Sequence, residues 1–253
     1  MKSKLAVDVE NMLVSDRLDQ SIGAHFRSEH IQSRARALQA DFRVNGFCKI
    51  PGFLPDAVRP LLDADISQHL ERCASKDFIP LDVGWPHPGP DCYGQPLSDA
   101  LATAVALPSA PSLRRLIGAI MGDGSEASPD QVFLPPLVQV ADEAHESAWK
   151  WATAPCSVTW VSRAPRRGNG GEFQFIAAGA SAEGPDAISR LLASRPIESH
   201  YIEENTAYLI RGDQNLHRVS PLKNGDMRVA FSFECALAPA TSRAGARQSA
   251  LST

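Results

Sequence analysis

The sequence has no excess of positive charge. Its 25 lysine and arginine residues stand against 29 aspartate and glutamate residues, which gives a formal net charge of −4 and an isoelectric point near 6.0. Nucleic acids and anionic membranes attract proteins through clustered basic side chains, and the composition shows no such excess. We therefore expect a small-molecule substrate, and neither nucleic acid nor a membrane as a partner.

Long apolar runs are also absent. No stretch of about 18 apolar residues occurs that could cross a bilayer as a helix. The amino-terminal stretch is interrupted by Asp8, Glu10 and Asn11, so it does not read as a secretory signal. The chain is expected to be soluble and cytoplasmic.

Cysteine is sparse and irregularly spaced. No two of the five cysteines form a C-x-x-C unit, and they stand at Cys48, Cys73, Cys92, Cys156 and Cys235. An odd, dispersed set of this kind is typical of reduced thiols, and it excludes a disulfide framework or a zinc site.

The length and the hydrophobic content suit one domain with a sizeable core. The chain has 253 residues, of which 43% are hydrophobic. We expect a single domain over residues 1–240, with a helical part at about 1–125 and a β-rich part at about 130–237. Residues 241–253 lack periodicity and are expected to form a flexible tail.

Local patterns support this division. Apolar residues at helical spacing predict helices over 28–42, 55–73, 97–107 and 112–121, with a short strand over 46–50. The proline-rich and glycine-rich stretch 77–97 predicts a long loop, which we interpret as a substrate lid. Short β-rich runs follow at 132–140, 156–164, 171–178, 199–204, 206–212 and 227–237, with a helical insert at 185–193. Such short strands between turns are typical of a sandwich or barrel.

The most informative segment is 207–231, AYLIRGDQNLHRVSPLKNGDMRVAF. It reads as a strand, a turn, His217, a second turn and a final strand that carries Arg228. A single histidine in a β-rich segment is more often structural than functional, so the weight of the prediction lies in the compound pattern.

This pattern resembles the second half of the iron(II)/2-oxoglutarate-dependent oxygenase superfamily. The resemblance implies a double-stranded β-helix (jelly-roll, cupin-like) core with flanking helices, a mainly β member of the α+β class. It also implies that His217 binds iron and that Arg228 clamps the distal carboxylate of 2-oxoglutarate. Arginine suits that role because its planar fork meets a carboxylate through two hydrogen bonds.

The first half of the superfamily's metal site is altered. A subgroup from bacterial amino-acid and antimetabolite pathways has W-H-W-D here, followed by a strand ending in A-P and then by G-G. This chain has Trp149-Lys150-Trp151-Ala152, then Ala164-Pro165 and Gly170-Gly171. By this register, Lys150 replaces the histidine and Ala152 the carboxylate of the facial triad.

Both replacements remove a metal ligand. A lysine ammonium has no lone pair at neutral pH and brings a positive charge, and alanine has no donor atom. Two alternatives remain open. An insertion could bring His145 into the ligand position, or the site could be that of a radical halogenase, in which a small residue such as Ala152 leaves room for a halide on iron.

Three functions are therefore weighed. The first is a small-molecule biosynthetic enzyme of secondary metabolism that acts on an amino-acid-like substrate without metal or cofactor. The second is a genuine Fe(II)/2-oxoglutarate oxygenase or halogenase with unorthodox metal ligands, His217 and His145. The third is a pseudoenzyme that binds a ligand or pairs with an active paralogue as a regulatory or structural subunit. The protein is expected to form a homodimer or a heteromer with such a paralogue. The candidate catalytic side chains are Lys150 and His217, and the candidate binding residues are Arg228, Arg211, Trp149, Trp151 and Trp160.

Overall fold

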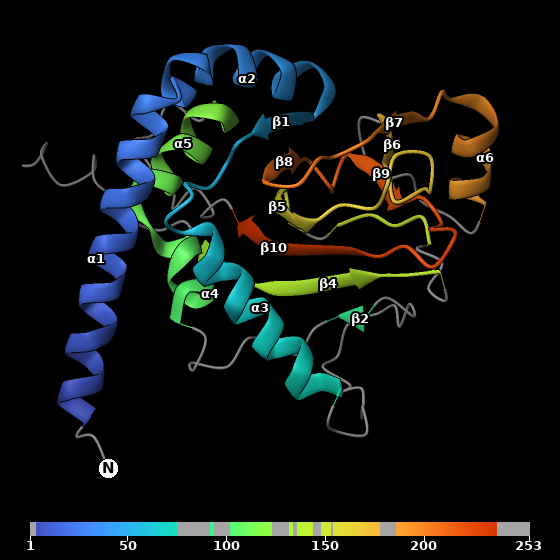
Figure 1. Cartoon of the computed structure of the whole chain (residues 1–253). Coiled ribbons are helices and arrows are strands. Elements are labelled where there is room, and N and C mark those ends of the chain that lie inside the picture. The colour runs from blue at the N-terminus through green and yellow to red at the C-terminus, as the bar shows by residue number, and fades with distance from the viewer. Residues whose placement is uncertain are drawn as a thin grey trace, which may run out of the picture.

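The computed structural model describes residues 4–74, 92–93, 102–122, 132–133, 136–143, 148–152, 154–177 and 186–236 (Figure 1). Its helices are α1 (Lys4–Ser28), α2 (Ile31–Asn45), α3 (Arg59–Ala74), α4 (Ala102–Ala106), the 3-10 helix η1 (Leu107–Ser109), α5 (Pro111–Met121) and α6 (Ala187–Ser194). Helices from the amino-terminal half fix one another's ends. Asp65 on α3 accepts hydrogen bonds from the backbone N–H groups of Thr103 and Ala104, and Asp19 on α1 accepts one from Ser112.

The strands form two antiparallel sheets. They are β1 (Phe47–Pro51), β2 (Cys92–Tyr93), β3 (Val132–Phe133), β4 (Leu137–Ala141), β5 (Cys156–Arg163), β6 (Phe173–Ala177), β7 (Glu198–His200), β8 (Thr206–Ile210), β9 (Asn215–Val219) and β10 (Arg228–Ala236). The larger sheet has the order β1-β8-β5-β10-β4-β2, with β3 on β10, and the smaller sheet has the order β7-β6-β9. Segment 148–152 joins β9 through a bridge between Lys150 and His217.

The chain passes back and forth between these sheets. From β4 in the larger sheet it passes to segment 148–152 beside β9, returns at β5, crosses to β6 and β7, returns at β8, crosses to β9 and returns at β10. Two facing antiparallel sheets connected in this way form a jelly-roll. The predicted fold class is therefore confirmed.

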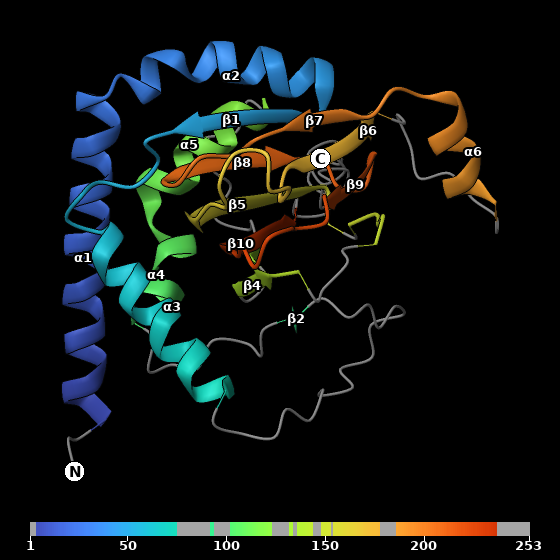
Figure 2. The ribbon, with the colours of Figure 1, turned by 45° about the vertical axis from the view of Figure 1, so that its right-hand side comes forward.

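The two faces of the larger sheet have different neighbours. Figures 1 and 2 agree that α1 to α5 lie on one side of it, with the smaller sheet on the other. Val158, Trp160, Phe231 and Phe233 pack into the core beneath the helices. The inward face holds a separate core of residues from both sheets, namely Phe47, Val161, Phe173, Phe175, Ile202, Tyr208 and Ile210. Because side chains alternate along a strand, this division tells which residues of β5, β8 and β10 face the barrel interior.

The predicted element boundaries need three corrections. The helix expected over 28–42 begins at Ile31, after His30 in the left-handed region (φ 54°), and Ser28 ends α1 instead of capping α2. The helix expected over 55–73 begins at Arg59. His217 does not lie between two turns but within β9. The helix expected over 97–107 is described only from Ala102.

Some predicted segments fall outside the described residues. These are the tail 241–253 and most of the loop 77–97, in which Cys92 and Tyr93 form β2 and pair with β4. In the part of the chain that the structure describes, no helix is long and apolar enough to span a membrane.

Candidate functional site

Lys150 and His217 are direct cross-strand neighbours. The backbone N–H of each donates to the carbonyl oxygen of the other, and both N···O distances are 2.9 Å. Two antiparallel residues that exchange both hydrogen bonds project their side chains from the same face of the sheet. On β9 that face also carries Val219, which lies opposite the inward-facing Phe173. The structure thus brings Lys150 beside His217 inside the barrel.

Ala152 reaches the same place. Its backbone N–H donates to the carbonyl oxygen of Gly212 at 2.9 Å. A methyl group added at Gly212 would lie 2.2 Å from Cβ of Ala152 and 3.3 Å from Cε1 of His217. Ala152, Gly212 and His217 are therefore packed together, and Gly212 is required there because no larger residue fits. The three positions expected to carry metal ligands converge.

His217 is held as a neutral imidazole. Its side chain is 9% exposed, and Nδ1 lies 2.9 Å from the carbonyl oxygen of Asn215, which can only accept a hydrogen bond. The pKa of His217 is lowered to about 4, mainly by burial and in addition by the positive charge of Lys150, while the hydrogen bond to Asn215 acts in the opposite direction. With the proton on Nδ1, the lone pair of Nε2 is left for a ligand.

Replacement of His217 by glutamine is expected to flatten the pH dependence of stability. Because the pKa is about 4 in the folded chain and 6.5 ordinarily, the unfolded chain binds more protons between these values. The free energy of unfolding therefore falls as the pH drops from 6.5 to 4, by on the order of 3 kcal/mol from this group. Urea denaturation of both proteins at pH 7 and pH 4 measures the difference. If His217→Gln lost as much free energy of unfolding between pH 7 and pH 4 as the natural chain, His217 would not be the group responsible.

Arg228 lies deeper in the barrel at the start of β10. It is 2% exposed, and its Nη2 donates to the hydroxyl of Tyr208 at 3.3 Å. Its Nε is buried without a hydrogen-bond partner among the described residues. A buried guanidinium that lacks an anionic partner is costly, and a ligand carboxylate would supply one. This arrangement fits the carboxylate of 2-oxoglutarate or of a similar acid.

Three more polar residues share this inward face of β10 or lie across from it. Ser232 and Thr159 contact each other through their hydroxyls at 3.0 Å. Glu234 follows two residues after Ser232 on the same face, and its Oε2 is buried without a hydrogen-bond partner among the described residues. The sequence reasoning missed these residues because they lie within a mainly apolar strand, and only the alternation of β10 could have indicated them.

Two of the predicted binding residues do not face the interior. Trp160 is fully buried on the helix side of the larger sheet, where its Nε1 donates to Asn205 at 3.0 Å. Arg211 lies over the ring of Phe42 on α2. Trp160 is one of the β5 side chains that point toward the helices, and Arg211 packs outside the barrel against α2.

The two tryptophans around Lys150 also lie apart from the interior. The guanidinium of Arg218 stacks over the ring of Trp149 at 4.7 Å, and Arg218 alternates with His217 on β9, so this contact lies on the outer face of the smaller sheet. Alternation places Trp151 with Trp149, away from Lys150. The structure thus places Trp149 on the outer face of the smaller sheet, and the role of Trp149 and Trp151 in binding substrate stays a prediction. His145 lies outside the described residues.

The donor set does not fit a ferrous ion. Non-haem iron of this type needs two imidazoles and a carboxylate, or two imidazoles and a halide. Of the three converging positions, His217 alone offers a lone pair. Among the residues that the structure describes, no group of three or more His, Cys, Asp or Glu side chains could hold a metal ion.

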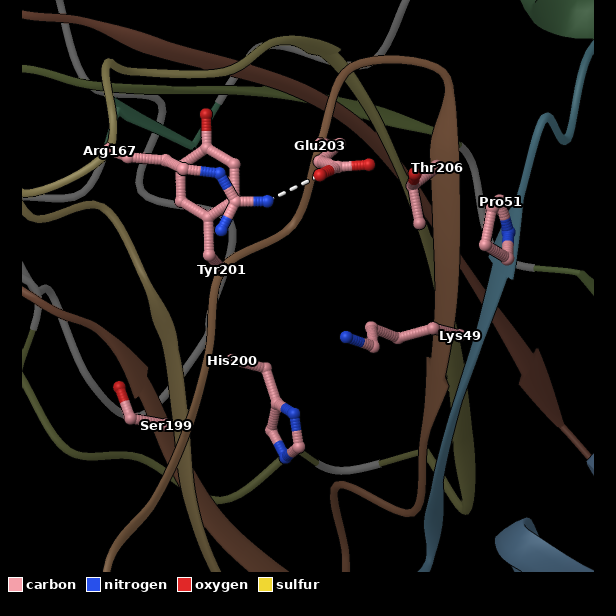
Figure 3. Close-up of a pocket in the computed structure, with 8 residues that line it drawn as sticks. All are labelled: Lys49, Pro51, Arg167, Ser199, His200, Tyr201, Glu203 and Thr206. Atoms are coloured by element: carbon pink, nitrogen blue, oxygen red, sulfur yellow. Dashed lines mark hydrogen bonds and ion pairs between the residues drawn. The ribbon is translucent and has the colours of Figure 1, made fainter.

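A separate cavity lies between β1 and the segment after β7. It has a volume of about 300 Å³ and is lined by Lys49, Pro51, Arg167, Ser199, His200, Tyr201, Glu203 and Thr206. Figure 3 shows Lys49 and His200 pointing into it, while Arg167 forms an ion pair with Glu203 at its rim. None of the residues predicted from the sequence lines this cavity, so it is not the site that the motif indicates.

Comparison with known proteins agrees with the fold. The sequence profile described as Halogenase D matches residues 30–249. No curated protein gives a significant match. Solved structures with this fold include AviO1 from Streptomyces viridochromogenes Tue57, with TM-score 0.59 and 16% identity over 81% of this chain and 96% of that chain. They also include the non-heme alpha ketoglutarate dependent epimerase SnoN from nogalamycin biosynthesis, with TM-score 0.59 and 15% identity over 81% and 84%.

A third neighbour is a prolyl hydroxylase from Trichoplax adhaerens, with TM-score 0.54 and 14% identity over 82% of this chain and 92% of that chain. SnoN has also been solved with Fe3+ and alpha ketoglutarate. At these identities the structural likeness shows the fold. The resemblance to the 2-oxoglutarate oxygenases that the motifs indicated is confirmed.

Proposed function

Because this chain belongs to the Halogenase D family but carries Lys150 in place of a metal-binding histidine, we propose that it is a biosynthetic enzyme that works without iron. Its substrate in this proposal is a small, amino-acid-like acid bound inside the barrel. The observation that carries the proposal is the bridge that sets the Lys150 side chain beside His217.

The charges of the interior support binding of an acid. Arg228 presents a buried guanidinium without an anionic partner among the described residues, and Lys150 adds a second positive charge near His217. A carboxylate held by Arg228 at one end leaves the reacting end of the ligand near Lys150. There the Lys150 ammonium donates hydrogen bonds to a carboxylate or carbonyl oxygen of the ligand. It stabilises negative charge that develops on that oxygen and can act as a general acid.

Neutral His217 complements this cation. Its pKa of about 4 keeps it unprotonated at neutral pH, so the lone pair of Nε2 can accept a hydrogen bond from the ligand or from Lys150. The interior then holds one positively charged donor and one neutral acceptor side by side. Both act on the ligand directly, and no metal ion is needed to bring them together.

Titration with 2-oxoglutarate in the presence of a strong chelator tests the proposal. The natural chain is expected to bind the acid, and Lys150→Met is expected to bind it at least about tenfold more weakly, because one charge-assisted hydrogen bond is lost. Lys223→Met removes an exposed lysine between β9 and β10 and serves as the matched control. Binding that requires added Fe(II) would overturn the proposal.

The second candidate is an iron-dependent halogenase. The family match and the small side chain of Ala152, which would leave room for a halide, favour it. Stoichiometric iron in the purified chain, together with turnover of 2-oxoglutarate, would establish this candidate and exclude metal-free chemistry. Failure to bind any small acid, with co-purification of a paralogue, would instead favour the role of a pseudoenzyme subunit.

A further inference from the structure

The inward face of β10 carries opposite charges at its two ends. Val229, Phe231, Phe233 and Cys235 pack under the helices, so Arg228, Ala230, Ser232 and Glu234 face the barrel. Arg228 and Glu234 are six residues apart, which corresponds to roughly 20 Å between their backbones at about 3.3 Å per residue. A ligand in the barrel therefore meets a guanidinium toward one end and a carboxylate toward the other.

One oxygen of the Glu234 carboxylate lacks a hydrogen-bond donor among the described residues. This atom, Oε2, is buried. Burial raises the pKa of Glu234, and the positive charge of Lys150 opposes that rise. Buried acceptors are almost always hydrogen-bonded, and an unsatisfied one in a site marks a position where a ligand supplies the donor.

Lys150 connects Glu234 to the proposed site. On the inward face of the larger sheet, Glu234 lies opposite Ser157, and Ser157 lies opposite Ile210. Gly212, two residues after Ile210, packs against Ala152 and His217, so Glu234 lies toward the end of the barrel that holds Lys150. The positive charge of Lys150 acts on both His217 and Glu234. A carboxylate anchored by Lys150 carries its α-substituent one bond away from the carboxylate carbon. An α-ammonium group at this point would be attracted to Glu234, whereas an α-oxo group would place an oxygen near its negative charge.

We propose that Glu234 is a specificity-determining residue that accepts a hydrogen bond from the α-amino group of the substrate. The inference rests on the proposed function of the same site and goes beyond it, because it selects 2-amino acids over 2-oxo acids. With the guanidinium of Arg228 holding a second anionic group, the preferred ligand is an amino acid that bears an acidic group at its far end.

Three five-carbon dicarboxylates that differ at C2 test this inference. They are L-glutamate, 2-oxoglutarate and glutarate, each titrated by calorimetry into the natural chain in chelator. L-Glutamate is expected to bind at least about tenfold more tightly than glutarate, because a charge-assisted hydrogen bond contributes a factor of this order or more. The isosteric Glu234→Gln variant is expected to lose that preference, and its affinity for 2-oxoglutarate is expected to stay equal or to rise.

The control variant is Glu172→Gln. Oε2 of Glu172 accepts a hydrogen bond from Ser199 at the smaller sheet, outside the proposed site, so the preference should remain. Equal binding of the three acids to the natural chain, or an unchanged preference in Glu234→Gln, would overturn this inference while leaving the proposed function intact. Failure of all three acids to bind would overturn the proposed function and this inference together.

Discussion

The Lys150→His variant is expected to bind one ferrous ion per chain, whereas the natural chain is expected to bind none. Position 150 exchanges two backbone hydrogen bonds with His217, so a histidine there would project beside His217 from the same face. Two imidazoles beside Ala152 make up the donor set of a halide-binding ferrous site. The affinity for iron should rise by at least about 100-fold, or roughly 2.7 kcal/mol.

Iron analysis after gel filtration, with chloride and 2-oxoglutarate present, measures this gain. Lys223→His is the matched control, because it places the same residue at an exposed position between β9 and β10. Stoichiometric iron in the natural chain would contradict the metal-free proposal. A well-folded Lys150→His variant without iron would show that position 150 does not face the ligand position.

Arg228→Met is expected to weaken binding of 2-oxoglutarate strongly while leaving the ligand-free protein equally stable or more stable. Arg228 is buried, and among the described residues no carboxylate lies within ion-pair distance of it, while its Nη2 donates to the Tyr208 hydroxyl. Replacing a buried, unpaired charge by an apolar side chain of similar volume removes a desolvation cost. Loss of the ligand's buried charge partner should weaken binding at least about 30-fold, or roughly 2 kcal/mol.

Calorimetric titration and urea denaturation of the same samples separate the two effects. Arg218→Met removes an arginine from the outer face of β9, where it contacts Gln174 and Trp149, and should leave binding unchanged. A marked fall in stability of the ligand-free Arg228→Met variant would show that the guanidinium is a structural group. Unchanged binding would remove Arg228 from the site.

The sequence was a good guide to which residues come together and a poorer guide to the direction in which their side chains point. The motif register placed Lys150, Ala152 and His217 at corresponding positions, and the bridge to β9 places them together in space. The side on which Trp160 lies could not be predicted, because β5 is buried on both faces and its apolar pattern does not distinguish the interior from the helix side. Composition cannot resolve this ambiguity, since both faces need large apolar side chains.

Other errors have local causes. His217 was expected between two turns because glycine, aspartate, asparagine and proline surround it, yet the five residues of β9 pair with β6 throughout. Helix α2 begins later than predicted because His30 adopts a left-handed conformation that the side-chain pattern does not encode. Glu234 could not be predicted as a site residue, because its proposed role depends on the charge of Lys150. Lys150 is 84 positions away in the sequence, and only the folded chain brings its charge to act on Glu234.

The bridge between segment 148–152 and β9 has an evolutionary consequence. Its two hydrogen bonds join backbone atoms, so any residue other than proline can form them at position 150. A mutation there exchanges the group that faces His217 and leaves the pairing of the strands unchanged. One substitution at position 150 therefore exchanges a metal ligand for a cation, or the reverse, and the backbone pairing that positions it stays in place.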